Sequence, residues 1–146
     1  MTDAEPRFVD TNILVYANQS GSAHRMAALA LLERMEVNQA PLWISGQILR
    51  EYLAVVTRPQ GQFPGLSMAY ALERVRFFSQ RFWIADDGPE IRSQLLTLLT
   101  TYPTAGKQVH DANIVATMLA NGVTHLLTNN VADFRRFGSL ITIEAP

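Results

Sequence analysis

The sequence contains no cysteine, and it has no apolar run of the roughly 20 residues that a membrane-spanning helix needs. Without thiols the chain can form neither a disulfide nor a thiolate zinc site. Residues 1–6 are acidic, which is unlike the positively charged start of a signal peptide. We therefore expect a cytoplasmic protein that does not associate with membranes.

Charge of one sign is also lacking, because the formal net charge is only −1. Such a balance gives no general attraction to nucleic acid. Only one of the 12 basic residues, Lys107, is a lysine. The others are arginines, which suit bidentate contact with phosphate, but GC-rich coding produces the same bias. The composition alone therefore does not indicate a phosphate-binding protein.

What the sequence does have is a globular composition, with 146 residues of which 48% are apolar. A chain of this length typically forms one domain that buries roughly two thirds of its unfolded surface. We expect a single domain over residues 1–146, with a poorly ordered tail over residues 1–6.

Short apolar runs alternate with amphipathic segments along the chain. The runs predict strands ending at Val9 and over residues 42–44, 83–85, 125–128 and 140–143. The amphipathic segments predict a first helix capped by Thr11 or Asn12, further helices over residues 23–37, 46–57, 68–81, 89–102 and 109–121, and a helical turn over 133–137. Alternation of this kind predicts a doubly wound α/β fold with about five short parallel strands covered by helices on both faces.

Within the helix predicted over residues 23–37, Met26, Leu29, Leu32 and Met35 recur at spacings of three. We expect this stripe to face the core. Apolar stripes exceed what one core needs, which suggests a homodimer.

Most of the 13 acidic residues have ordinary explanations. They lie at the chain ends, as Glu144 does, on polar helix faces, or in turns beside Gly and Pro, and we expect them to be solvated. Four acids remain: Asp10, Glu51, Asp111 and Asp133.

Asp111 is the most informative of the four. At 100° per residue it falls between Val115 and Met118 on the apolar side of its helix. A carboxylate there costs several kcal/mol unless it is paired or bound to a metal. The helix dipole recovers only about 0.3–1 kcal/mol. A buried N-terminal cap is the alternative.

Asp10 and Asp133 each follow a predicted strand, and parallel strands bind ligands at their carboxyl ends. A simpler alternative exists for each of these two acids and for Glu51: Asp10 could be a turn residue, Asp133 a helix cap, and Glu51 a residue on a solvated helix face. Together they predict one crevice in which carboxylates repel each other. Mg²⁺ or Mn²⁺ relieves such repulsion, and these ions promote phosphodiester hydrolysis.

Four segments carry a family resemblance: Phe-Val-Asp10-Thr-Asn-Ile-Leu-Val-Tyr, Leu-Arg-Glu51-Tyr, His-Asp111-Ala and Leu-Leu-Thr128-Asn-Asn-Val-Ala-Asp133-Phe. In order and spacing they resemble the PIN-domain ribonucleases, and among these the VapC-type toxins of bacterial toxin–antitoxin pairs. The resemblance extends over residues 7–143. It implies a PIN-like three-layer α/β/α sandwich, a metal-dependent endoribonuclease and an antitoxin partner.

The resemblance also implies roles for single residues. Asp10 and Asp111 would be the principal ligands of one or two Mg²⁺ or Mn²⁺ ions, and Glu51 and Asp133 would complete the acidic set. The residues expected to support these acids are Thr11, Asn12, Thr128 and Asn130. Asn130 stands where many members have an acid, so the number of ions stays open.

Because the acids cannot attract RNA, arginines should hold its phosphates. The candidates are Arg50, Arg58, Arg81, Arg135 and Arg136, each of which could equally be an ordinary surface residue. The sequence contains no glycine-rich phosphate loop, so we expect no organic cofactor. Two alternatives remain: a PIN-like module that binds RNA or protein without cleavage, and a phosphotransferase with Asp10 as nucleophile. The second usually has another Asp two residues on, where this chain has Asn12.

Overall fold

The computed structural model describes residues 4–146 of the chain. The predicted tail therefore lies partly outside the described residues, at 1–3. Within the described part, the Glu5 carbonyl accepts a 2.6 Å hydrogen bond from Arg7 Nη1. No helix in residues 4–146 combines the length and apolar character needed to cross a membrane.

Five parallel strands form one sheet in the order β3-β2-β1-β4-β5. Their bounds are β1 (Arg7–Val9), β2 (Leu42–Ser45), β3 (Trp83–Ala85), β4 (His125–Leu127) and β5 (Thr142–Glu144). The helices are α1 (Thr11–Asn18), α2 (Arg25–Val37), α3 (Gly46–Val56), α4 (Met68–Arg81), α5 (Pro89–Thr101), α6 (Gln108–Ala120) and α7 (Val131–Phe134), with the 3-10 helix η2 (Arg135–Phe137).

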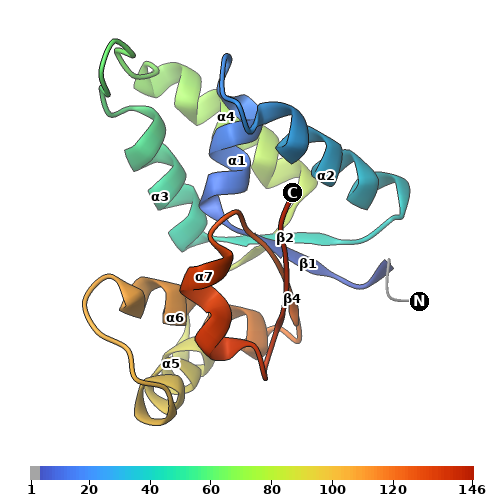
Figure 1. The fold of residues 1–146 in the computed structure, drawn as a ribbon, viewed down its shortest axis with the longest axis vertical. Coiled ribbons are helices and arrows are strands. Elements are labelled where there is room, and N and C mark those ends of the chain that lie inside the picture. The colour runs from blue at the N-terminus through green and yellow to red at the C-terminus, as the bar shows by residue number, and fades with distance from the viewer. Residues whose placement is uncertain (1–3) are drawn as a thin grey trace.

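Helices cover both faces of this sheet. Figure 1 shows α1 to α4 on one side and α5, α6 and α7 on the other. The predicted α/β fold with about five parallel strands is confirmed. β5 begins at Thr142 rather than at residue 140, because Leu140 and Ile141 still donate to the Phe137 carbonyl at the end of η2.

Short polar side chains begin several helices. Ser45 accepts a hydrogen bond from Ile48 N at the start of α3, and Ser67 accepts one from Tyr70 N at the start of α4. The residue that caps α1 is Asp10, not Thr11 or Asn12, since its side chain accepts from Thr11 N. The first acid of the predicted site is thus fixed by the strand-to-helix turn itself.

The stripe predicted for α2 is right for two of its four residues. Met35 is buried and Leu32 packs against the core, but Met26 is 74% exposed and Leu29 is also exposed. The other residues of α2 that face the core are Ala28 and Leu31. Because α2 carries apolar side chains on nearly every side, their spacing does not determine which side is buried.

Glu144 was expected to be solvated, and this expectation is wrong. Its Oε1 accepts a 2.9 Å hydrogen bond from Arg7 Nε, and only 24% of its side chain is exposed. β4 lies between β1 and β5, so the long Arg7 side chain crosses β4 to reach its partner. The buried guanidinium requires an anion, and the end of the last strand supplies it.

Candidate active site

Asp10 lies at the carboxyl end of β1 and is only 5% exposed. Its Oδ1 accepts from Thr11 N at 2.8 Å, and its Oδ2 accepts from Thr128 Oγ1 at 2.7 Å and Asn12 Nδ2 at 2.9 Å. All these donors are neutral. Burial raises the pKa of Asp10, and Glu51 raises it further, while the hydrogen bonds from Thr128, Thr11 and Asn12 act in the opposite direction. Asp10 is therefore a buried acid held without a counter-charge.

The donors to Asp10 also join the ends of two strands. Asn12 Oδ1 accepts from Asn129 N at 2.8 Å, just beyond β4. Thr128 Oγ1 accepts from Asn130 N at 3.0 Å. Asn12 and Thr128 thus connect the carboxyl ends of β1 and β4, which fixes the Asp10 side chain in one rotamer.

Glu51 comes from the middle of α3 and is partly buried. Both carboxylate oxygens are held: Oε2 accepts from Thr11 Oγ1 at 2.7 Å, and Oε1 accepts from Gln47 Nε2 at 3.0 Å. The alternative of a fully solvated helical glutamate is therefore wrong. The helix turns Glu51 toward the residue that follows Asp10.

Asp111 and Asp133 lie in the first turns of α6 and α7. Burial, followed by the charges of Asp10, Asp133 and Glu51, raises the pKa of Asp111 to about 6. Neither acid caps its helix, because Lys107 and Asn130 occupy the two cap positions. The capping alternatives are thus wrong, and the other three acids are near enough to affect the ionisation of Asp111.

A cavity of about 780 Å³ adjoins three of the acids. Its polar lining includes Asp10, Glu51, Asp111 and Asn130, and its apolar lining includes Tyr16, Val55, Phe63, Leu66 and Tyr70. Asp133, which is exposed, does not line the cavity, and neither does any arginine or lysine. The cavity lining therefore combines acidic with aromatic side chains and contains no basic side chain.

These residues fit a divalent metal ion in their chemistry but are not arranged as a finished coordination sphere. Within residues 4–146, no group of three or more acidic or histidine side chains lies close enough to hold one ion. The prediction of four gathered carboxylates is thus met only in part. The pKa values of Asp10 and Asp111 are nevertheless raised, and no arginine or lysine lines the cavity beside them. Carboxylate oxygens are the donors that Mg²⁺ and Mn²⁺ prefer.

The predicted RNA-contact arginines are dispersed. Arg50 pairs with Asp87 at 3.6 Å, and Arg81 lies over the Phe77 ring in a second cavity, of about 960 Å³. Arg136 donates to the Pro103 carbonyl and to Gln108, and it also lowers the pKa of Asp111. Arg58 and Arg135 are exposed. Of the five, Arg136 has the clearest electrostatic link to the acids.

Gln47 was missed in the sequence. It is buried on α3, where it contacts Glu51, the His110 backbone and Asn113. A signal was available, because a polar residue at Gln47 lies one helical turn before Glu51 and beside the apolar Ile48. Its partners on α6 are distant in sequence and could not be read from a local pattern.

A five-stranded parallel sheet with helices on both faces and acids at the strands' carboxyl edge defines the class as an α/β protein with an acidic cleft. The model of the PIN domain family matches residues 7–140, so the chain belongs to that family.

Known relatives agree with this assignment. The chain is 27% identical over 132 residues to ribonuclease VapC24 of Mycobacterium tuberculosis, covering 89% of this chain and 90% of the relative. A chain of the VapBC2 complex from Rickettsia felis, bound to a promoter DNA fragment, is similar in fold with a TM-score of 0.66 and 22% identity; the match covers 96% of this chain and 98% of that one. VapC20 of M. tuberculosis, a Sarcin-Ricin loop cleaving toxin, has a TM-score of 0.63 at 19% identity, covering 86% and 92%.

Proposed function

We propose that the protein is a metal-dependent endoribonuclease and the toxin of a VapC-type toxin–antitoxin pair. The observation that carries the proposal is Asp10, a buried carboxylate that faces a cavity with Glu51 and Asp111 and has only neutral donors. A protein retains an uncompensated buried acid at a cost in stability, which points to a function for the charge. The names of the relatives support ribonuclease activity.

In this proposal Asp10 and Asp111 hold Mg²⁺ or Mn²⁺, and Glu51 and Asp133 complete the acidic set. A bound ion of this kind activates water and stabilises charge on the phosphate. The chain's own contribution is to orient the acids: Thr11 and Gln47 hold Glu51, and Thr128 holds Asp10. Asn130 adds no charge, so the proposal requires only a single ion.

The substrate we propose is single-stranded RNA. Tyr16, Phe63 and Tyr70 line the cavity beside the acids, and unpaired bases stack on such side chains. Because no arginine or lysine lines the cavity, it suits a neutral base better than a phosphate. Arg58, Arg135 and Arg136 are left to contact phosphates outside it.

We further propose that the protein acts in the cytoplasm, pairs with an antitoxin and forms a homodimer. Several large apolar side chains are exposed, among them Met26 and Leu29 on α2 and Phe77 on α4. Leu29 and Phe77 also line the second cavity, with Trp83 beside them. Exposed apolar surface of this kind marks protein interfaces, and structures of similar fold are VapBC complexes.

The test is cleavage of single-stranded RNA by the purified protein, free of any partner, in Mg²⁺ or Mn²⁺. We expect EDTA to abolish cleavage, and Asp111→Asn to reduce it at least about 100-fold. Asp87→Asn, which removes an exposed acid paired with Arg50, is the control and should leave the rate unchanged. Cleavage that persists in EDTA would contradict the metal-dependent mechanism.

One observation favours a second candidate, a module that binds RNA or protein without cleaving. The acids of the described chain are not assembled into a ready metal cluster. Absence of RNA cleavage with excess Mn²⁺, in a protein that still binds RNA, would select this alternative.

A further inference from the structure

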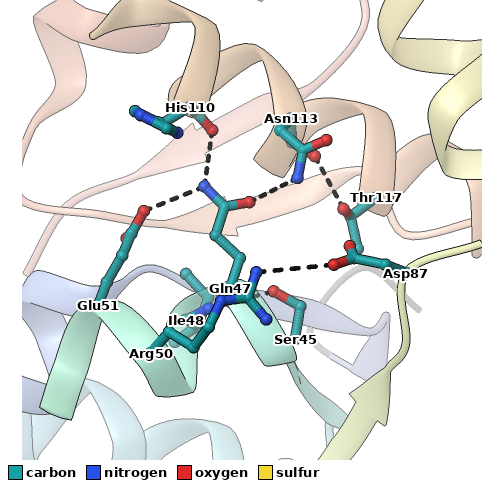
Figure 2. A network of polar contacts seen from close by, with 9 residues as sticks. All are labelled: Ser45, Gln47, Ile48, Arg50, Glu51, Asp87, His110, Asn113 and Thr117. Atoms are coloured by element: carbon teal, nitrogen blue, oxygen red, sulfur yellow. Dashed lines mark hydrogen bonds and ion pairs between the residues drawn. The ribbon is translucent and has the colours of Figure 1, made fainter.

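The Gln47 side chain connects α3 to the first turn of α6. It is 6% exposed, and its Nε2 donates to Glu51 Oε1 at 3.0 Å and to the His110 carbonyl at 2.9 Å. Its Oε1 accepts from Asn113 Nδ2 at 2.8 Å. Figure 2 shows the amide between Glu51 on one side and the α6 residues on the other.

These partners permit only one orientation of the amide. Rotating it by 180° would direct its oxygen at Glu51 Oε1 and the His110 carbonyl, which are both acceptors, and its NH₂ group at the Asn113 donor. Both hydrogens of the Gln47 amide are used, one by Glu51 and one by the His110 carbonyl, so the amide holds these two groups in fixed positions relative to each other. A buried amide satisfied in this way is rigid.

Gln47 also completes a chain of contacts that links three acids. Asp10 accepts from the backbone of Thr11, whose hydroxyl donates to one oxygen of Glu51. The other Glu51 oxygen accepts from Gln47, which also holds the residue before Asp111. The link therefore runs through α1, α3 and α6, three helices that are not consecutive in the sequence.

We propose that Gln47 is a positioning residue, which holds the Glu51 carboxylate and sets its distance from Asp111 so that the acids can share a cation. This inference rests on the proposed function of the same site. An apolar side chain of similar length could fill the space at Gln47, so packing alone does not account for an amide there. The amide matters because it donates to an acid of the site and to the element that carries the next acid.

The experiment compares Gln47→Met with wild type in three measurements: thermal stability, Mn²⁺ affinity by calorimetry, and RNA cleavage. Met approximates the length of Gln without its hydrogen bonds. Ser45→Ala is the matched control, because the Ser45 hydroxyl caps α3 through Ile48 N and makes no hydrogen bond to Glu51. We expect Gln47→Met to lower Mn²⁺ affinity and kcat about 10–100-fold, with KM for RNA little changed. Ser45→Ala should lower thermal stability only.

A double-mutant comparison separates positioning from packing. If Gln47 acts through Glu51, Gln47→Met should have little further effect on Mn²⁺ affinity in a Glu51→Ala background. An equal loss in both backgrounds, or a loss no larger than that of Ser45→Ala, would overturn the inference.

A readout without metal distinguishes failure of this inference from failure of the proposed function. Hydrogen exchange of the backbone amides of residues 112–115 should be faster in Gln47→Met than in Ser45→Ala, because the first turn of α6 loses its link to α3. A wild-type protein that neither binds Mn²⁺ nor cleaves RNA would overturn the proposed function and the positioning role together. Functional wild-type protein with unchanged exchange in Gln47→Met would overturn the positioning role alone.

Discussion

The two ends of β1 each carry a buried charge, and they treat it differently. At the amino end, Arg7 is 4% exposed and is neutralised by Glu144 through a 2.9 Å ion pair. At the carboxyl end, Asp10 is equally buried but accepts hydrogen bonds only from amides and a hydroxyl, and the charge that affects its pKa, that of Glu51, is negative. One charge is compensated within the fold, and the other is not.

Under the proposed function, this difference separates a charge that stabilises the fold from a charge that is available to a metal ion. Burying an ion costs several kcal/mol, and an opposite charge recovers much of that cost. Neutral donors stabilise the Asp10 carboxylate but leave its charge available to an external cation. Arg7 should therefore matter for stability, and Asp10 for activity and metal binding.

The largest effect should come from Asp10→Asn. We expect RNA cleavage to fall about 1,000-fold, equivalent to about 4 kcal/mol, while the free energy of unfolding without metal changes by no more than about 1 kcal/mol. Removing the buried charge stabilises the fold, but the new NH₂ group faces donors, so the two effects offset each other. Single-turnover kinetics and urea unfolding measure the two quantities. Strong destabilisation with intact cleavage would reverse the comparison.

Arg7→Met should give the opposite pattern. Removing one member of a buried pair leaves Glu144 uncompensated, and we expect a loss of about 2–3 kcal/mol in unfolding free energy, less than for a fully buried pair because Glu144 is partly exposed. The folded fraction should cleave RNA at the wild-type rate. Urea unfolding followed by activity per folded molecule would test this, and a selective loss of kcat would contradict it.

Local sequence patterns predicted the sheet well and the burial of single helices less well. β1, β2, β3 and β4 each contain a short apolar run, and polar residues flank these runs, a pattern that marks strands clearly. In α2, however, Met26 and Leu29 looked like core residues and are exposed, while the small Ala28 is buried. Neighbouring helices, not the apolar pattern, decide which side of such a helix faces inward.

The acids were found in the sequence because each was out of place locally, but their connections were not. Asp111 lies on an apolar helix side, and Asp10 ends a strand. The contacts from Gln47 to His110 and from Arg7 to Glu144 join residues far apart in the chain. Only the tertiary fold determines such pairs, which is why the contacts of Gln47 with α6 were not predicted and Glu144 was expected to be solvated.

The stability of the fold should fall as the pH rises, because Asp111 on α6 and Asp10 at the end of β1 both have raised pKa values. Asp111 binds a proton more tightly in the folded protein, where its pKa is about 6, than in the unfolded chain, where it is near 3.8. Its ionisation therefore lowers stability progressively as the pH rises from about 4 to 6, by about 1–2 kcal/mol after allowing for partial solvation. The raised pKa of Asp10 acts in the same direction.

Thermal unfolding across this pH range, with and without Mn²⁺, measures the effect. Asp111→Asn should flatten the decline, and Mn²⁺ should oppose it in wild type because the ion binds the ionised acids. A stability that rises between pH 4 and 6 in both proteins would show that other groups dominate, against the view that the acids are left uncompensated.

The smallest effect should come from Glu144→Gln, which asks whether Arg7 needs a charge or only an acceptor. The amide oxygen can still accept from Arg7 Nε, and the Glu5 carbonyl still accepts from Arg7 Nη1. We expect a loss of about 1 kcal/mol in urea unfolding, smaller than for Arg7→Met, because the hydrogen bond survives and only its charge assistance is lost. A loss as large as that of Arg7→Met would mean that the opposite charge itself stabilises this end of β1. The contrast with Asp10, which is held by neutral donors alone, would then be sharper.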